Sequence, residues 1–393
     1  MARPVLRTAI CDLLDIEYPI VLAGMGGVAT AELVAAVSDA GGLGIVGAAG
    51  MGPDEIDAQV RRIRDLTNRP FGVDILLPSG VAGPPRQDGG AARPATGPSE
   101  RPRRLVEMLP PAYQEFVRKA KAEFDLPEDV DADAAPGVGR VVRRMSADFT
   151  KSQVDAILEH KVPVFASGLG NPGPYVEAFH SIGSKVIGLV GNVKSARKVA
   201  EGGTDVVVAQ GHEAGGHTGR IGTLALVPQV VDAVAPTPVL AAGGVGDGRG
   251  IAAALAMGAQ GVWVGTAFLV SREANWPQLL KDRILAATEE DTRVTRLYSG
   301  KTMRNVTNPL IEYWEQEGLG ALPMGAQGIV SGEISTAARA AGKLELTMNP
   351  AGQISGMLHE SRPAKEILED LVSETARILS EELPRRVQIA VEP

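Results

Sequence analysis

Short apolar runs alternate with helical patterns along most of the chain, and this alternation limits the fold more than any other feature of the sequence. Each run is nearly continuous in hydrophobic residues, as strands are when both faces of a parallel sheet are buried. Eight runs have this character: residues 18–23, 43–46, 71–76, 162–166, 185–190, 206–208, 238–242 and 261–264. Because glycine-rich segments follow their carboxyl ends, we predict an α/β fold, a (β/α)8 TIM barrel.

An open, doubly wound sheet is the alternative to the barrel. Such a sheet often carries a GxGxxG turn that binds a dinucleotide after its first strand. Residues 24–29 (GMGGVA) have the first two glycines of that turn but lack the third, and no acidic ribose ligand stands clearly downstream. The barrel is therefore the favoured fold.

The alternation is interrupted once and stops well before the end of the chain. Residues 78–104 are rich in proline, glycine and arginine and show no periodicity. The insertion that they begin is either a lid over a site or a disordered surface loop. We predict three parts: a barrel of residues 1–77 and 148–275, a partly flexible insertion after the third strand at 78–147, and a C-terminal helical extension packed on the barrel at 276–393.

The charge balance argues against several classes of partner. The formal net charge is −8 over 393 residues, whereas nucleic acids and anionic membrane surfaces are bound by basic faces. The single cysteine, Cys11, cannot form an intrachain disulfide, and the first residues lack the apolar core of a signal peptide. We expect a cytoplasmic protein, a monomer or homodimer, that acts on a small-molecule substrate and has no nucleic-acid or membrane partner.

Residues 205–219 join a buried strand to a polar, glycine-rich loop. Gln210 ends the strand, and its amide both donates and accepts hydrogen bonds, which suits the edge of a heteroaromatic ring. His217 follows Gly215 and Gly216 in a loop without apolar periodicity. A histidine in this setting is a candidate general base or proton donor, and the alternative is an exposed loop histidine.

Two further polar residues, His212 and Glu213, lie in the same loop. We expect Glu213 either to orient His217 or to cap a backbone amide, and His212 to be a solvent-facing bystander. The HExxxH spacing differs from the helical HExxH of zinc enzymes, and the paired glycines argue against a helix. We therefore predict no metal site.

Glycines also follow the last two predicted strands, at Gly243-Gly244 and at Gly265-Thr266. In barrels, the loops after strands seven and eight commonly hold a phosphate on backbone amides and a helix N-terminus. The alternative is that these glycines only allow helices to pack tightly on strands. No GxxxxGK[ST] motif is present, so nucleotide hydrolysis has little support.

Four segments resemble the nitronate monooxygenase family, formerly called 2-nitropropane dioxygenases: PIVLAGMGGVAT, AQGHEAGGHTG, PVLAAGGVGDG and GVWVGTAFL. The resemblance runs from Pro19 to Ser271 apart from the insertion. It implies a barrel with non-covalent FMN at the carboxyl ends of the strands, and His217 as the catalytic base or acid. The positions that it places at FMN are Ala23, Gly24, Met25, Asp74, Gln210, Gly215, Gly216, Gly243, Gly244, Trp263, Val264, Gly265 and Thr266.

Asp74 departs from the family pattern, which often has asparagine there, and an ionised carboxylate cannot donate a hydrogen bond to FMN. The insertion is also longer than the family pattern. The same signature is shared by flavin-dependent enoyl-acyl-carrier reductases and NAD(P)H:quinone reductases. Three functions therefore stay open: nitronate oxidation with O₂, reduction of an enoyl thioester or quinone with NAD(P)H as reductant, and flavin binding without catalysis.

Overall fold

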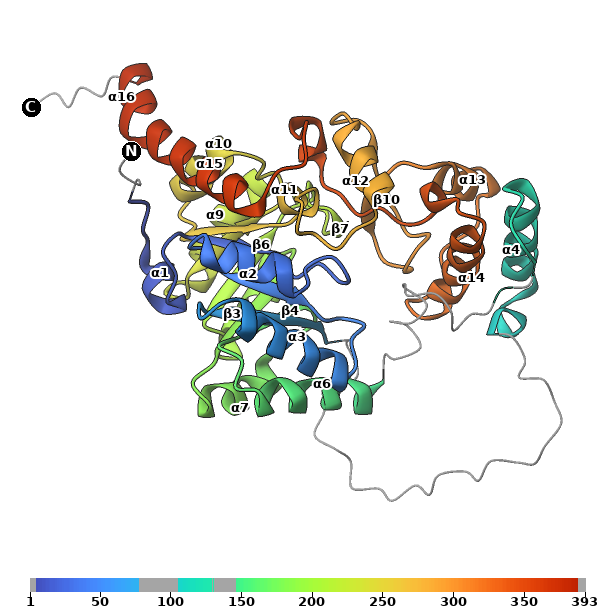
Figure 1. Ribbon diagram of the computed structural model, residues 1–393, viewed down its shortest axis with the longest axis horizontal. Helices are drawn as coiled ribbons and strands as arrows, with labels where there is room; N and C mark the ends of the chain where they lie inside the picture. The colour runs from blue at the N-terminus through green and yellow to red at the C-terminus, as the bar shows by residue number, and fades with distance from the viewer. Residues whose placement is uncertain (1–4, 78–104, 129, 131–145, 388–393) are drawn as a thin grey trace, which may run out of the picture.

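The computed structural model describes residues 5–77, 105–128, 130 and 146–387. In these residues, eight parallel strands form one sheet in the order β1-β9-β8-β6-β5-β4-β3-β2 (Figure 1). A bridge between Val21 and Leu43 closes the sheet between its first and last strands. The predicted (β/α)8 barrel is confirmed. Its strands are β1 Ile20–Leu22, β2 Gly44–Gly47, β3 Phe71–Leu76, β4 Val164–Leu169, β5 Lys185–Val190, β6 Val206–Gln210, β8 Val239–Ala242 and β9 Gly261–Val264.

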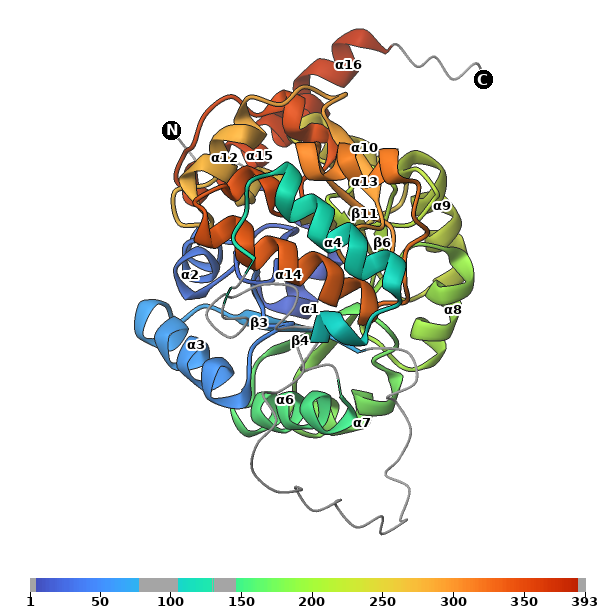
Figure 2. The same cartoon turned by 90° about the vertical axis from the view of Figure 1, so that its right-hand side faces the viewer.

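Helices surround the strands as a ring, which Figure 2 shows in a view along the barrel. The helices between strands are α2 Ala31–Asp39, α3 Pro53–Leu66, α6 Ala147–Glu159, α7 Val176–Ser181, α8 Val193–Glu201, α9 Thr223–Val234 and α10 Gly248–Ala256. The short helix α11 (Thr266–Leu269) follows β9. The ring is completed by α15 (Ala364–Arg377), which packs against both α10 and α2. A helix from the end of the chain therefore takes the eighth position.

The interior of the barrel is filled by alternate residues of the strands, because side chains of a strand point to opposite faces in turn. Val206 and Val208 of β6 face inward, while Val207 between them faces the helices. Helix α1 (Ala9–Leu14) adds Ile10 and Leu14 to the interior cluster. Apolar side chains therefore fill the end of the barrel where the strands begin. The polar loops of the predicted site lie at the other end, where the strands finish.

A second hydrophobic core lies in front of that other end (Figure 2). It joins α4 (Pro111–Glu123) of the insertion to α13 (Pro309–Glu317) and α14 (Ala326–Ala340) of the extension. The rings of Phe116 and Trp314 meet edge to face, with centroids 5.0 Å apart, a favoured aromatic geometry. We call these three helices the helical lobe. Two segments far apart in sequence thus share one core.

A buried ion pair also joins the insertion to the extension. Lys121 on α4 is 3% exposed and its Nζ lies 2.7 Å from Glu333 Oε1 on α14. The ammonium group also donates to the Glu128 carbonyl oxygen at 2.9 Å. A buried charge is tolerated when it is paired and hydrogen-bonded, so this contact fixes how α4 lies on α14.

The extension contains strands as well as helices, which the sequence did not lead us to expect. Strand β11 (Met303–Val306) pairs antiparallel with β10 (Thr292–Thr295) on one side and with β7 (Gly216–His217) on the other. The remaining elements are α12 Gln278–Leu285, α16 Leu383–Arg386, and the short helices η1 Leu105–Met108, η2 Gly173–Tyr175, η3 Leu344–Leu346, η4 Gln353–Met357 and η5 Ile378–Glu382. The small sheet ties the loop after β6 to the extension.

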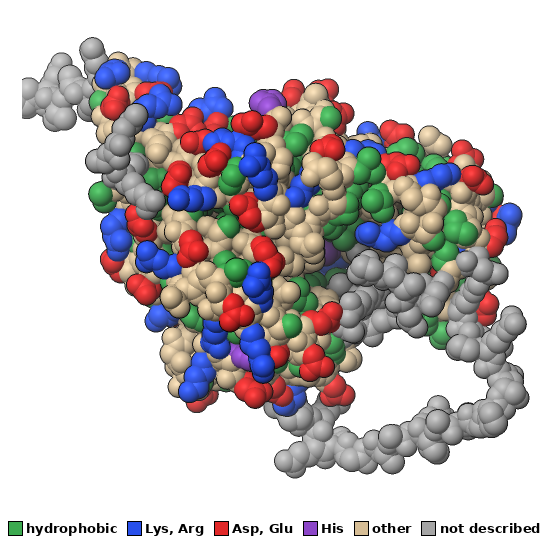
Figure 3. Space-filling model, viewed as in Figure 1, with side chains coloured by type: hydrophobic (Ala, Val, Ile, Leu, Met, Phe, Trp, Pro, Cys, Tyr) green, Lys and Arg blue, Asp and Glu red, His purple; other side chains and the backbone are tan. Residues whose placement is uncertain are grey.

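The predicted lid falls mostly on residues 78–104 and 131–145, which lie outside the described residues. The predicted three-part division of the chain stays a prediction. Within the described ranges, no helix is both long and apolar enough to span a bilayer. The face in Figure 3 mixes acidic and basic side chains, and a recess separates the barrel from the helical lobe.

Candidate functional site

His217 lies at the carboxyl end of the barrel and is held from three directions. Its backbone pairs with Met303 of β11. Its carbonyl oxygen accepts a hydrogen bond from Gln210 Nε2 at 2.5 Å. Its Nε2 lies 2.9 Å from Ser299 Oγ. Backbone and ring are thus both fixed, as a residue that moves a proton requires.

The imidazole of His217 is kept neutral by its surroundings. Burial, with the nearby charge of Lys301 as a smaller cause, lowers the pKa of His217 to about 4. Desolvation disfavours the charged imidazolium, and a like charge adds to that effect. At neutral pH the ring is therefore able to accept a proton.

Ser299 is a residue of the candidate site that the sequence did not reveal. It is 2% exposed, and its hydroxyl also accepts a hydrogen bond from the Lys301 amide at 3.3 Å. Thr302 Oγ1 donates to the Thr218 carbonyl oxygen at 2.8 Å, which ties the same turn to the residue after His217. No periodicity or motif near residue 299 signals this partnership, because the strand pairing creates it.

Gln210 has a role inside the protein that was not predicted. Its amide nitrogen holds the carbonyl oxygen of His217 rather than pointing only to a ligand. A contact between Gln210 and a flavin ring stays a prediction. The observed bond makes Gln210 a link between the end of β6 and the candidate catalytic histidine.

The two other polar residues of the loop support the backbone. Glu213 accepts hydrogen bonds from the Thr223 amide at 2.9 and 3.0 Å and from Thr223 Oγ1 at 2.9 Å, so it caps the start of α9. Of the two expected roles of Glu213, capping is the one observed, and Ser299 rather than Glu213 bonds the His217 ring. His212 Nδ1 lies 2.7 Å from the Gly219 carbonyl oxygen. It is half-buried and helps to close the loop.

Backbone lines the place where the loops after β6 and β9 meet the extension. A Cβ added to Gly215 would stand 2.6 Å from the carbonyl carbon of Ala351. A Cβ added to Gly352 would stand 2.7 Å from the Glu213 carbonyl oxygen. The Gly352 amide donates to Thr266 Oγ1 at 3.0 Å. Residues 351–352 were missed, and the small residues of the segment NPAG were the signal for a close approach.

The loop after β8 joins the same place. Gly243 and Gly244 have φ values of 88° and 76°, which glycine adopts without strain. A Cβ on Gly243 would stand 3.0 Å from the Gly211 carbonyl oxygen, next to the loop of His217. Gly216 also has a positive φ, of 70°. We call Gly215, Gly216, Gly243, Gly244, Gly265, Thr266 and Gly352 the glycine cradle.

The loop after β1 lies beside the loop after β9. A Cβ on Gly265 would stand 3.4 Å from the Ala23 Cβ and 3.6 Å from the Met25 sulfur. The Trp263 side chain belongs to the barrel interior and the Val264 side chain to the outer core. The predicted flavin contacts of Trp263 and Val264 stay predictions.

Asp74 stands at the same end of the barrel, on β3. The residue is 5% exposed, and its Oδ1 accepts a hydrogen bond from the Gly168 amide at 2.6 Å. Burial raises the pKa of Asp74 to about 7, although the Gly168 bond acts in the opposite direction. Gly24 faces this carboxyl group, since a Cβ there would stand 2.3 Å from Oδ2.

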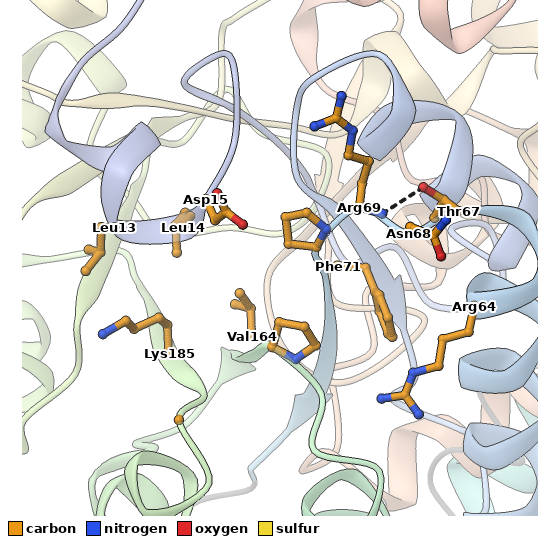
Figure 4. A pocket seen from close by; sticks show the side chains of 13 residues that line it. Leu13, Leu14, Asp15, Arg64, Thr67, Asn68, Arg69, Phe71, Val164 and Lys185 are labelled. Carbon is orange, nitrogen blue, oxygen red and sulfur yellow. Dashed lines mark hydrogen bonds between the residues drawn. The ribbon is translucent and has the colours of Figure 1, made fainter.

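Two other features do not compete with this site. Among the described residues, no three His, Cys, Asp or Glu side chains gather as a metal site would need. A hollow of about 570 Å³ lies at the amino ends of β3, β4 and β5, lined by Phe71, Val164 and Lys185 (Figure 4). Barrel enzymes place their sites at the opposite, carboxyl ends of the strands, so this hollow is not the candidate active site.

A buried, neutral histidine beside a glycine cradle, at the carboxyl ends of barrel strands, defines a barrel enzyme. The chain belongs to the nitronate monooxygenase family, whose model matches residues 7–95 and 111–374. It is thus an oxidoreductase of the nitronate monooxygenase type.

Similar proteins agree with this assignment. Rv1533 of Mycobacterium tuberculosis, provisionally named a monooxygenase, is 37% identical, and the match covers 94% of this chain and 96% of that protein. The structure of nitroalkane oxidase from Streptomyces ansochromogenes is similar with a TM-score of 0.75 and 30% identity, over 95% of this chain and 99% of the other. FabK from Thermotoga maritima is similar with a TM-score of 0.73 and 31% identity, over 97% and 100%.

Proposed function

We propose that this protein is an FMN-dependent oxidoreductase that oxidises alkyl nitronates with O₂. The observation that carries the proposal is His217, a histidine kept neutral by burial and fixed by Ser299 and Gln210 next to the glycine cradle. Membership of the nitronate monooxygenase family supports the reaction class. The likeness to a nitroalkane oxidase structure supports a nitro compound as the substrate.

The glycine cradle suits the phosphate of FMN. Gly243 and Gly244 have left-handed backbone and carry no side chain, so their amides are open to an anion. Thr266 brings a hydroxyl group to the same place. The loop of Ala23, Gly24 and Met25 would hold the ring. When bound, FMN carries the electrons of the reaction, while the protein supplies orientation and electrostatics.

The chain's own residues would then handle the proton and the charge. Ser299 Oγ holds His217 Nε2 at 2.9 Å and so sets the plane of the ring. The neutral ring can accept and hold a proton beside a substrate oxygen. Lys301 brings a positive charge near His217, and this charge favours an anionic substrate such as a nitronate. The expected partner is a small molecule, with the protein as a monomer or homodimer.

The test begins with the cofactor. Protein supplied with FMN should be yellow and keep its flavin absorbance after gel filtration, and protein that never retains flavin would exclude the proposal. Anaerobic mixing with an alkyl nitronate should then bleach the flavin, and admission of O₂ should restore its colour.

A reductase that takes hydride from NAD(P)H and reduces an enoyl thioester or a quinone is the second candidate. The likeness to FabK, at 31% identity over 97% of this chain, favours it. Rapid anaerobic bleaching by NADH or NADPH would support this candidate, and bleaching by nitronates alone would support the oxidase. A flavin-binding protein without catalysis would show bound FMN that neither reagent bleaches.

A further inference from the structure

The Asp74 carboxyl group is enclosed by two glycines, Gly24 in the loop after β1 and Gly168 near the carboxyl end of β4. A Cβ on Gly24 would stand 2.3 Å from Oδ2 and 2.4 Å from the Asp74 Cβ, and a Cβ on Gly168 would stand 2.8 Å from Oδ2. Any side chain at either position would displace the carboxyl group. Gly24 follows the carboxyl end of β1, and Gly168 is the last but one residue of β4. The carboxyl group is therefore seated at the mouth of the barrel, beside the loop that would hold the flavin ring.

No described positive charge compensates this carboxyl group. Its paired strand neighbours are Gly47 on β2 and Ala166 on β4, and the glycines that face its carboxyl group are Gly24 and Gly168. None of these four residues has an ionisable side chain. The Gly168 amide, at 2.6 Å from Oδ1, is the one hydrogen-bond donor that the described residues supply to the carboxyl group. A buried carboxylate with a single donor is costly, and protonation removes that cost.

A neutral carboxylic acid has two different oxygen atoms. One accepts a hydrogen bond and the other donates through its proton, as the oxygen and nitrogen of a carboxamide do. Oδ1 of Asp74 already accepts from Gly168. Oδ2, which faces Gly24, is then the atom that carries the proton and donates.

We propose that Asp74 is a proton-dependent flavin contact: as a neutral acid its Oδ2–H donates a hydrogen bond to an acceptor of the FMN ring, and as a carboxylate it weakens FMN binding. This inference rests on the proposed FMN-dependent function. The rise of the pKa of Asp74 to about 7 through burial is consistent with a neutral acid in mildly acidic solution. Loss of the proton removes the donor and places a negative charge beside the acceptor atom of the ring.

The proposal predicts that FMN affinity depends on pH. If only the neutral acid binds, the dissociation constant rises about tenfold for each pH unit above about 7, and so about 100-fold by pH 9. Burial lowers the pKa of His217 to about 4, so His217 changes charge well below that range. The phosphate of FMN also changes charge with pH, and it does so equally for every variant. The result is therefore the difference between the pH profiles of wild type and variant.

The experiment measures FMN dissociation constants by quenching of flavin fluorescence between pH 6 and pH 9. The affinity of wild type for FMN should fall as the pH rises. Asp74→Asn donates a hydrogen bond at every pH, so its affinity for FMN should change with pH only as far as titration of the FMN phosphate changes it. Asp282→Asn, an exposed aspartate on α12, is the matched control and should follow wild type. Parallel profiles for Asp74→Asn and wild type would overturn the inference while the proposed function stands.

Failure of wild type to bind FMN at pH 6 would instead overturn the proposed function itself. A second measurement keeps the inference testable if Asp74→Asn does not fold. Infrared difference spectra of FMN-loaded wild type should show a protonated carboxyl band at pH 6 that disappears by pH 9 as flavin is released. Release of flavin with no change in that band would refute the role of Asp74.

Discussion

Replacement of Asp74 by asparagine should stabilise the flavin-free protein at alkaline pH. Aspartate in an unfolded chain ionises near its ordinary pKa of 3.8, whereas burial raises the pKa of Asp74 to about 7 in the fold. Between these values the folded protein binds one proton more than the unfolded chain, so wild-type stability falls as pH rises from about 4 to about 7. Above about pH 7 Asp74 is ionised in both the folded and the unfolded state, and the free energy of unfolding stays at its lowered value.

The size of the effect follows from the same shift. A difference of about three pH units, at about 1.4 kcal/mol each, corresponds to roughly 4 kcal/mol of unfolding free energy. Asparagine keeps the acceptor for the Gly168 amide and has no charge to bury. The variant should therefore unfold at higher urea concentration than wild type at pH 8, and the difference should shrink towards pH 4.

Tryptophan fluorescence during urea unfolding is a suitable assay, because Trp263 lies inside the barrel and reports on that unit. Measurements at pH 5 and pH 8 on both proteins separate the charge effect from any general effect of the substitution. An asparagine variant that is equally stable or less stable than wild type at pH 8 would show that the Asp74 carboxyl group is not buried as an uncompensated charge.

Three further predictions concern the site. His217→Ala should retain FMN and lose turnover by about 10²- to 10⁴-fold, and unchanged flavin bleaching by substrate would remove His217 from the mechanism. Lys301→Gln should raise the pKa of His217, since one cause of its lowering is gone; histidine NMR or the acid limb of the pH–rate profile would detect the change, and an unmoved limb would contradict it. Gly215→Ala should weaken FMN binding and cost roughly 1–3 kcal/mol of stability, because the new Cβ meets backbone at 2.6 Å. Gly320→Ala, whose Cβ meets nothing within 4 Å, is its control, and equal melting temperatures for these two variants would refute the crowding argument.

The strands of the barrel could be predicted from the sequence because burial on both faces leaves a continuous apolar run. Val206–Gln210 is an example, because its run of three valines is too short for a helix and typical of a buried strand. Strand β11 could not be found in this way. It has four residues, MRNV, of which Arg304 and Asn305 are polar, and its partner His217 lies far away in the chain. Such a strand is stabilised by its neighbours rather than by its own composition.

The residues of the candidate site also differ in how far the sequence alone predicts them. His217 and the glycines after β6, β8 and β9 were predictable, because residue type alone marks them. Ser299 was not, since it gains its role from a contact with a distant segment. Gly352 was missed, although the small residues around it indicate a close approach of backbone. Asp74 was recognised as a departure, but its burial and its single amide donor are properties of the packed barrel that no local pattern contains.

The three-stranded sheet has a mechanical consequence. His217 lies on β7, which continues from the barrel strand β6, yet its only strand partner in the described residues is β11 of the extension. A rigid-body displacement of the extension away from the barrel must therefore either break the pairing of Met303 with His217 or pull the histidine out of line with Gln210. The position of His217 therefore depends on how the extension packs on the barrel. A change that loosens the extension should also move His217 out of the arrangement that Gln210 and Ser299 hold.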